Sequence, residues 1–179
     1  MDVTAPASRA ALSDPAAAFE RLFLAEYARV VSIAHRVLAD GAAAEDVAQE
    51  VFADFHRRHR PDATWAGAWL HRAAVHTALN ALRSGRRRGT RESREANERR
   101  SSAVNPEQMV LEAERLALVR AALGRLPERT ATILALRYSA LSYAAVAAAI
   151  GVSANSVGTL LRRAEEAFRK EVGDALDPD

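Results

Sequence analysis

The sequence contains no cysteine, and that absence excludes several kinds of chemistry. A chain without thiols has no disulfide, no cysteine nucleophile and no cysteine-ligated metal site. Lysine is scarce as well, because Lys170 is the single lysine and arginine carries nearly all of the positive charge. We give this arginine bias little weight as a sign of nucleic-acid binding, since a GC-rich genome also favours arginine and alanine.

No apolar run approaches the roughly 20 residues that span a membrane. The N-terminal sequence, MDVTAPASRAALSDP, also lacks the basic start and apolar block of a secretory signal. These two features predict a soluble, cytoplasmic protein without membrane insertion.

Aromatic residues make up only 6% of the chain, whereas hydrophobic residues, many of them alanine, make up 49%. Runs of Val, Ile and Thr are rare, so the composition favours helices over strands. A length of 179 residues suits one or two small domains. We therefore expect an all-α fold.

The stretch LSYAAVAAAIGVSANSVGTLLRRAEEAFRK, which begins at Leu141, contains the clearest motif. Ser142 is a candidate N-cap for a short helix, and Gly151 can adopt the positive φ that ends it. Ser153 can then cap a second helix. The pattern is typical of a helix-turn-helix, whose second helix enters the DNA major groove. The expected apolar stripe of that helix is Val157, Leu160, Leu161, Ala164 and Phe168.

The opposite face of this second helix carries side chains that suit DNA. Asn and Arg can contact base edges, and Ser and Thr can bind phosphates. The predicted DNA contacts are Ser153, Asn155, Ser156, Thr159, Arg162 and Arg163. A plain helical hairpin has the same spacing, so the motif alone leaves that alternative open.

Three further helices are predicted near the N-terminus, after a disordered leader over residues 1–14. Asp14-Pro15 supplies a cap and a first-turn proline for the first of them. The expected helices run to about Ala39, from about Ala43 to His56, and from about Trp65 to Arg83 or Arg88. Their short turns predict a three-helix domain over residues 15–88, called the N-terminal domain below.

The segment that follows is different in kind. From Arg83 to Arg100 it reads RSGRRRGTRESREANERR, with eight Arg, three Glu and no large apolar residue. Such a segment cannot offset its ordering entropy by burial, so we predict a flexible basic linker over residues 89–104. A second cap-plus-proline pair at Asn105-Pro106 then begins a helical C-terminal domain over residues 105–173.

Three segments, in this order, resemble an extracytoplasmic-function (ECF) sigma factor of the sigma-70 family. FERLFLAEYARVVSIAHRVLADGAAAEDVAQEVFADF resembles the start of the second conserved region, and AWLHRAAVHTALNALRSGRRR resembles its promoter-reading helix. LPERTATILALRYSALSYAAVAAAIGVSANSVGTLLRRAEEAF resembles the fourth region. The resemblance covers roughly residues 17–88 and 107–172. It implies a protein that lends promoter specificity to RNA polymerase and catalyses nothing itself.

In this family the acidic second helix docks on core RNA polymerase. The resemblance therefore assigns core-polymerase binding to Asp46, Gln49 and Glu50, with Phe52 buried behind them. Carboxylates can steer a basic partner and fix its register. Scattered acids usually form a solvated helix face, which is the alternative. The family usually has an anti-sigma factor as well, so one is expected as a partner.

The family also uses the loop before the Trp-Leu pair, and the helix after it, to hold unstacked bases of the promoter's minus-ten element. Aromatic and arginine side chains suit this task. The corresponding residues are Trp65, His71, Arg72, His76, Asn80, Arg83, Arg86, Arg87 and Arg88, whereas Trp69 is expected in the core. His76 and Asn80 stand where the family usually has Asn and Asp.

The fourth-region resemblance assigns the polar face of the second motif helix to the promoter's minus-thirty-five element. Gly158 departs from the family there, which often has Lys at this position. Glycine inside a helix costs about 1 kcal/mol relative to alanine. Gly158 either allows a close backbone approach to phosphate or has no function.

Two other function classes account for less of the sequence. A stand-alone helix-turn-helix regulator with an N-terminal sensor or dimerisation bundle leaves AEDVAQEVF and the arginine run unexplained. An enzyme is the third class, and His56 and His59 have a helical spacing that suits a metal. No third ligand stands at a suitable spacing, so we predict no catalytic residue, metal or cofactor.

Overall fold

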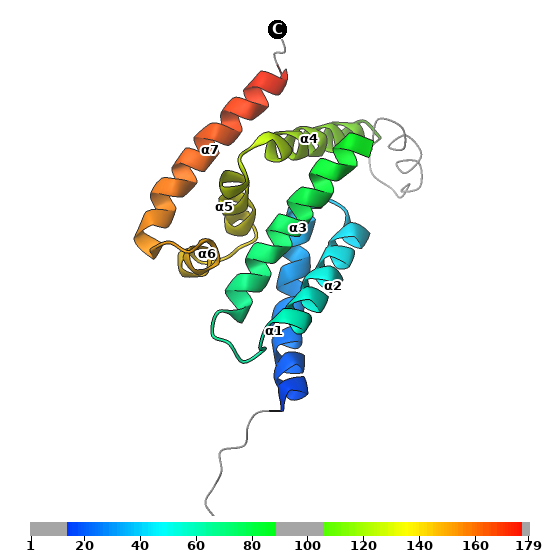
Figure 1. The fold of residues 1–179 in the computed structure, drawn as a ribbon. Coiled ribbons are helices and arrows are strands. Elements are labelled where there is room, and N and C mark those ends of the chain that lie inside the picture. Colours follow the sequence, from blue (N-terminus) through cyan, green and yellow to red (C-terminus); the bar gives the residue numbers. More distant parts are fainter. Residues whose placement is uncertain (1–13, 89–105, 177–179) are drawn as a thin grey trace, which may run out of the picture.

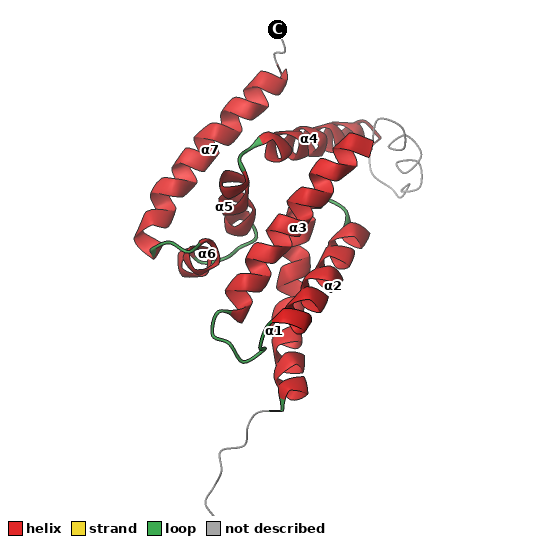
Figure 2. Cartoon of the chain, viewed as in Figure 1, coloured by secondary structure: helices red, strands yellow, loops and turns green. Residues whose placement is uncertain are grey.

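The helices that the sequence predicts are present with nearly the expected bounds. The computed structural model describes residues 14–88 and 106–176, and in these two stretches the chain is helical without a strand, which confirms the all-α class (Figures 1 and 2). The helices are α1 (Pro15–Leu38), α2 (Gly41–Arg58), α3 (Ala66–Arg88), α4 (Pro106–Arg125), α5 (Glu128–Tyr138), α6 (Tyr143–Ile150) and α7 (Ala154–Leu176). The leader and the linker predicted over residues 89–104 lie outside the described residues, apart from Asp14.

Local hydrogen bonds explain where several helices begin and end. The Asp14 carboxylate accepts a hydrogen bond from the backbone N–H of Ala16 at 3.0 Å, and α1 begins at Pro15. Ser142 caps α6 in the same way, with its hydroxyl 3.2 Å from the N–H of Ala145. Gly151 has a φ of +69° and ends α6, as the sequence indicates.

The N-terminal domain is a bundle of α1, α2 and α3. The apolar residues expected to face inward on α2 are all buried: Val47, Val51, Phe52 and Phe55. Helix α1 packs closely against both α2 and α3, whereas α2 and α3 are in less extensive contact. A groove of about 700 Å³ therefore remains between α2 and α3.

The C-terminal domain consists of α4 to α7. Helix α5 is its centre, because every residue from Ala131 to Leu136 is buried. Helix α7 packs on α4, α5 and α6. Helix α4 is different, since Val110, Leu111 and Leu116 along it are 58%, 59% and 48% exposed.

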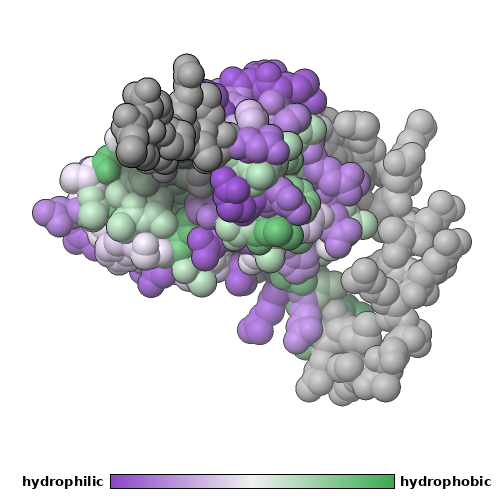
Figure 3. Space-filling view, turned by 90° about the horizontal axis from the view of Figure 1, so that it is seen from below, coloured by the Kyte–Doolittle hydropathy of each residue, from purple (hydrophilic) through white to green (hydrophobic). Residues whose placement is uncertain are grey.

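The two domains also pack against each other, which the sequence did not predict. Helices α5 and α6 contact α3, and Figure 1 shows them between α3 and α7. Buried side chains of both domains form one continuous core. On the face drawn in Figure 3, hydrophilic side chains surround smaller hydrophobic areas.

Among the described residues, no single helix is long and apolar enough to span a membrane. Helices α6 and α7 have the length and apolar composition of a membrane span only when they are taken together, and the chain bends by 85° between them.

Candidate nucleic-acid interface

Helices α6 and α7 have the geometry of a helix-turn-helix. The 85° bend between them is close to the roughly 90–120° of that motif. Val157, Leu161 and Ala164 are buried on one side of α7, which fixes the rotation of the helix. The opposite side is exposed, and it carries the predicted contacts Asn155, Ser156, Thr159, Arg162 and Arg163.

The first turn of α7 contains a local serine pair. Ser153 precedes the helix, and its hydroxyl oxygen lies 2.7 Å from that of Ser156. Both side chains are exposed. Contact with a DNA phosphate would exchange this mutual hydrogen bond for bonds to phosphate oxygens, which are stronger acceptors.

A second polar row lies on α3. Arg72, His76 and Asn80 are exposed, at the four-residue spacing that aligns side chains along one helix face. The Asn80 amide nitrogen lies 3.3 Å from Nδ1 of His76, so these two side chains contact each other. The backbone of α3 continues to Arg88, but the side chains of Arg86, Arg87 and Arg88 are outside the described part of the chain.

Arg83 belongs to the same face of α3, but its guanidinium is already bound. Its Nε donates to the carbonyl of Gly124 at 3.2 Å, and its Nη2 donates to that of Leu126 at 2.9 Å. These carbonyls lie at the C-terminal end of α4. In this arrangement Arg83 joins the two domains and is not directed at solvent.

Contrary to the expectation that it contacts DNA, His71 does not belong to the exposed row. It is 4% exposed, and its Nε2 lies 2.7 Å from a carboxylate oxygen of Glu26 on α1. One residue further along a helix rotates the side chain by about 100°, which separates His71 from its neighbour Arg72. His71 is therefore a link between α1 and α3.

The tryptophans belong to an aromatic cluster at the end of α2. His59 packs edge-on against Trp65 and Trp69, with ring centroids 5.1 and 4.8 Å apart. Phe55 lies beneath both tryptophans. Trp69 is partly buried against the core, as expected, whereas Trp65 is 47% exposed. Trp65 is thus the more accessible of the two tryptophans.

Aromatic contacts also surround His56 and His59, the two histidines whose spacing suits a metal. The His56 ring lies 4.5 Å from that of Phe19, and His59 packs on the tryptophans. Both imidazoles therefore have aromatic neighbours. Within the described residues, no three His, Asp or Glu side chains gather closely enough to hold a metal ion.

The loop that precedes Trp65 contains an exposed ion pair, Arg60 and Asp62, outside the predicted site residues. Arg60 donates two hydrogen bonds to the carboxylate of Asp62, at 3.2 and 3.0 Å. This bond, with the positive charge of Arg60, lowers the pKa of Asp62 below its usual value. The side chain of Arg60 remains highly exposed. Arg60 is one of three arginines in the run HRRHRP, and its charge was the available signal.

The acids of α2 line one wall of the groove between α2 and α3. Asp46, Glu50 and Asp54 recur every four residues along this wall, and His76 and Asn80 of α3 belong to the other wall. The groove thus brings together residues predicted to bind polymerase and residues predicted to bind DNA. Gln49 is exposed but does not line the groove.

Asp54 differs from the other two acids because it is engaged locally. Its Oδ1 lies 3.1 Å from Arg57 and 2.9 Å from Arg58, one helical turn further on. Asp46 and Glu50 are both fully on the exposed side of α2. They are therefore the groove acids best placed to meet a basic partner.

Comparisons with known proteins agree with this arrangement. The protein family described as "Sigma-70 region 2" matches residues 22–88, and the family described as "Sigma-70, region 4" matches residues 116–168. The RNA polymerase sigma-H factor of Pseudomonas aeruginosa is 31% identical over 173 residues, which cover 90% of this chain and 87% of that protein. The chain belongs to the sigma-70 family. The form of its fourth region is typical of the ECF type.

Membership of the sigma-70 family decides between the alternatives drawn from the sequence. The chain is an RNA polymerase sigma factor that directs transcription initiation, and not a stand-alone regulator. Sigma factors act with core RNA polymerase at promoter DNA. The N-terminal domain corresponds to region 2 and the C-terminal domain to region 4.

Proposed function

We propose that three surfaces divide the work of this sigma factor. The acidic wall of α2 binds core RNA polymerase, the exposed row of α3 binds the minus-ten element, and α7 binds the minus-thirty-five element. The observation that carries the proposal is the helix-turn-helix, because its buried side fixes which polar residues of α7 face outward. An amphipathic helix held in this way presents a constant set of side chains to a DNA groove.

For polymerase, the proposal assigns the main contacts to Asp46 and Glu50. Their carboxylates are exposed on one wall of the groove, and other acidic side chains of α2 are nearby. Like charges on one wall give a negative potential that accelerates encounter with a basic surface and orients it. Gln49 lies beside them on the exposed side of α2 and supplies a neutral hydrogen-bonding group.

For the minus-ten element, the proposal assigns stacking to Trp65 and polar contacts to Arg72, His76 and Asn80. Trp65 is half-exposed, and its ring is held by edge-type contacts with Phe55 and His59, so part of it remains available to a base. Stacking on an aromatic ring contributes about 1–3 kcal/mol per unpaired base. Arg72 is an exposed cation on the same helix and suits a phosphate.

For the minus-thirty-five element, the proposal assigns base contacts to the start of α7 and phosphate contacts to its later turns. Asn155 and Ser156 lie in the first turn, which is the part of a recognition helix that meets base edges. Arg162 and Arg163 lie about two turns further on. Arginine binds phosphate well by its charge and its planar donor pattern.

An anti-sigma factor is proposed as a further partner, acting with the sigma factor in the cytoplasm. The anti-sigma factor would bind the exposed apolar side chains of α4, which include Val110, Leu111 and Leu116. Exposed apolar side chains that gather on one element mark interaction sites.

The test is transcription in vitro with purified core RNA polymerase, followed by mapping of start sites across the genome. The proposal expects start sites that share two upstream sequence elements at a constant spacing. Arg72→Ala should weaken open-complex formation at all of them, whereas Arg21→Ala, an exposed arginine on α1, should not. Equal activity of the two variants would remove α3 from the minus-ten assignment.

A further inference from the structure

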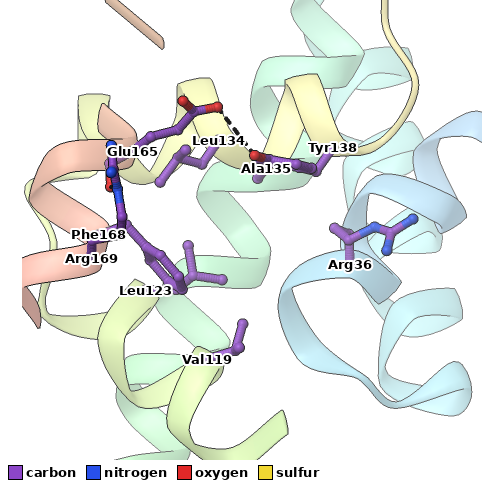
Figure 4. Close-up of a pocket in the computed structure, with 9 residues that line it drawn as sticks. All are labelled: Arg36, Val119, Leu123, Leu134, Ala135, Tyr138, Glu165, Phe168 and Arg169. Atoms are coloured by element: carbon purple, nitrogen blue, oxygen red, sulfur yellow. Dashed lines mark hydrogen bonds between the residues drawn. The ribbon is translucent and has the colours of Figure 1, made fainter. Parts of the chain in front are cut away.

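A cavity of about 640 Å³ is lined by side chains of α1, α4, α5 and α7 (Figure 4). This volume lies within the roughly 300–1,000 Å³ of ordinary small-molecule sites. The lining contains none of the residues assigned above to polymerase or to DNA. The proposed roles of α2, α3 and the start of α7 therefore leave this cavity without a function.

The floor of the cavity is apolar, and one side of it opens to solvent. Leu123 of α4 and Leu134 of α5 are both buried, and the ring of Phe168 from α7 is partly buried beside them. Val119 and Tyr138 also line the cavity, but they are 38% and 56% exposed. A ligand that enters past these two residues would remove its own apolar surface, and that of the floor, from water.

A pair of polar side chains is fixed on one side of the cavity. The Tyr138 hydroxyl donates to a carboxylate oxygen of Glu165 at 3.1 Å, and Figure 4 shows this pair across the cavity from Val119 and Leu123. Partial desolvation and this bond raise the pKa of Tyr138, so the phenol stays protonated at neutral pH. A few fixed polar groups in an otherwise apolar cavity are the usual means of orienting a small ligand.

Two exposed arginines, Arg36 and Arg169, supply positive charge at the rim. Nε of Arg169 donates to the backbone carbonyl of Glu165 at 3.3 Å, and its Nη groups have no partner among the described residues. Within residues 14–88 and 106–176, the Arg36 guanidinium makes no hydrogen bond or ion pair. The two guanidinium groups outnumber the single carboxylate of Glu165, so the rim attracts an anion rather than a cation.

We propose that this cavity binds a small amphipathic anion, namely a carboxylate with an aliphatic chain. The chain packs on the apolar floor formed by Leu123, Leu134 and Phe168, and the carboxylate stays at the rim within reach of the two arginines. Neutral and cationic molecules with the same chain can fill the floor but lack the attraction at the rim. The inference adds a ligand to this sigma factor and does not depend on the proposed contacts with DNA or polymerase.

The test uses decanoate, decanol and decyltrimethylammonium, three probes with the same chain and different head groups. Calorimetric titration of the full-length protein is done at about pH 8, where a carboxylate is ionised, and below the concentration at which the probes form micelles. Decanoate should bind at a single saturable site, decanol about threefold more weakly, and decyltrimethylammonium about tenfold more weakly, since exposed ion pairs contribute modestly. Equal affinity for the three probes, or no saturable binding of decanoate, overturns the proposal.

Filling the cavity should abolish decanoate binding. Val119→Trp places a bulky ring at the open side, and Leu116→Trp is the matched control, because Leu116 is an exposed residue of α4 outside the cavity. In the parent protein, NMR should show decanoate-dependent shifts of the Leu123 and Leu134 methyl groups and none of the Val110 methyl groups, since Val110 is exposed elsewhere on α4. Unchanged binding in Val119→Trp, or shifts spread along α4, would place decanoate outside the cavity and refute the site.

Reversing the charge of the rim tests the choice of an anion without altering the apolar floor. Arg36→Glu combined with Arg169→Glu should weaken decanoate binding about tenfold and strengthen binding of decyltrimethylammonium. Arg21→Glu combined with Lys170→Glu is the matched control, because it makes the same charge change at exposed positions of α1 and α7 outside the cavity. An equal loss of decanoate affinity in the two double variants would mean that net charge alone attracts the anion, and the proposed site would be wrong.

Discussion

His71 on α3 and Glu26 on α1 form a partly buried pair in which Nε2 lies 2.7 Å from Oε2. The two residues are 45 positions apart in the sequence. Gly67 leaves room for the carboxylate, because a Cβ at that position would lie only 3.3 Å from the other oxygen of Glu26. The pair fixes the register of α1 against α3, and it removes His71 from the DNA-facing set.

Replacing His71 should therefore destabilise the fold. His71→Ala removes the nearer partner of the largely buried Glu26 carboxylate and leaves it only the longer ion pair with Arg29, at 3.7 Å; loss of a hydrogen bond to a buried acceptor costs about 1–3 kcal/mol of the free energy of unfolding. Arg72→Ala, the exposed neighbour, should change that free energy by less than about 0.5 kcal/mol. Urea unfolding measures both. Equal midpoints would show that the pair contributes nothing to stability.

The contrast between His71 and Arg72 also shows what the sequence could predict. Helix bounds depend on local signals, such as the Asp14 cap and the glycine at 151, and both mark the helix ends that the structure shows. The apolar faces of α2 and α7 follow from periodicity, and their main residues are buried. Which polar residue of α3 is buried depends on a partner from α1, and no local pattern contains that information.

The packing of the two domains escaped prediction for the same reason. An arginine in a basic run is expected in solvent, yet Arg83 is bound to carbonyls more than 40 residues away. Backbone carbonyls at a helix end have no sequence signature. That they accept hydrogen bonds from Arg83 is therefore visible only once α4 is placed beside α3. The groove between α2 and α3 likewise results from three-helix packing, although each of its walls was predicted as a polar face.

Reversing one acid of the α2 groove should weaken polymerase binding. Glu50→Arg places a positive charge on the wall proposed to meet a basic partner, and loss of a buried charged contact costs about 2–5 kcal/mol in binding. Glu45→Arg is the control, because it is an equal charge change at an exposed position of α2 outside the groove. Affinity for core polymerase is the measurement. The same loss in both variants would mean that only net charge matters.

Tyr138 gives region 4 a sensitivity to alkaline pH. Although Tyr138 is 56% exposed, partial desolvation of its phenol, followed by a hydrogen bond to Glu165 at 3.1 Å, raises the pKa of Tyr138 above its ordinary value of about 10. The folded state thus favours the neutral phenol. The resulting stability is fully present below about pH 10 and is lost as the pH rises through the higher pKa of the folded state.

A titration followed by tyrosinate absorbance checks this behaviour. The folded protein should show a tyrosine titration step at a higher pH than the tyrosines of the unfolded chain, and Tyr138→Phe should remove that step. Tyr143→Phe, at a partly exposed position on α6, should leave that step in place. If the step survives in Tyr138→Phe, the raised pKa belongs to another group.

Gly158 either allows a close backbone approach to phosphate or has no function, and the structure suggests a test between these two explanations. An added Cβ would lie 3.8 Å from the nearest atom of Tyr143, which is an ordinary van der Waals contact. Gly158→Ala should therefore stabilise the domain by about 0.5–1 kcal/mol through its higher helix propensity. Thermal unfolding measures the gain. If the more stable variant binds promoter as well as the parent does, Gly158 has no role in approaching phosphate.

The polar face of α7 should show a division of roles along the helix. Asn155 is exposed in the first turn, and its amide suits an adenine edge, so Asn155→Ala should relax base preference at one or two positions of the minus-thirty-five element. The expected cost is about 1–3 kcal/mol if the contact is bidentate. Affinity of the holoenzyme for a panel of promoter variants measures this change.

Arg162 and Arg163 should behave differently, because their proposed contacts are with phosphates. Replacing both by Ala should weaken binding to every promoter alike and lower the salt dependence by about one unit of slope per lost contact. Val157→Asp is unsuitable as a test, since Val157 is fully buried and a charge there would unfold the domain. If Asn155→Ala leaves base preference intact while the arginine pair alters it, the order of roles along α7 is reversed. If neither change affects any promoter across the salt series, this face of α7 does not bind DNA.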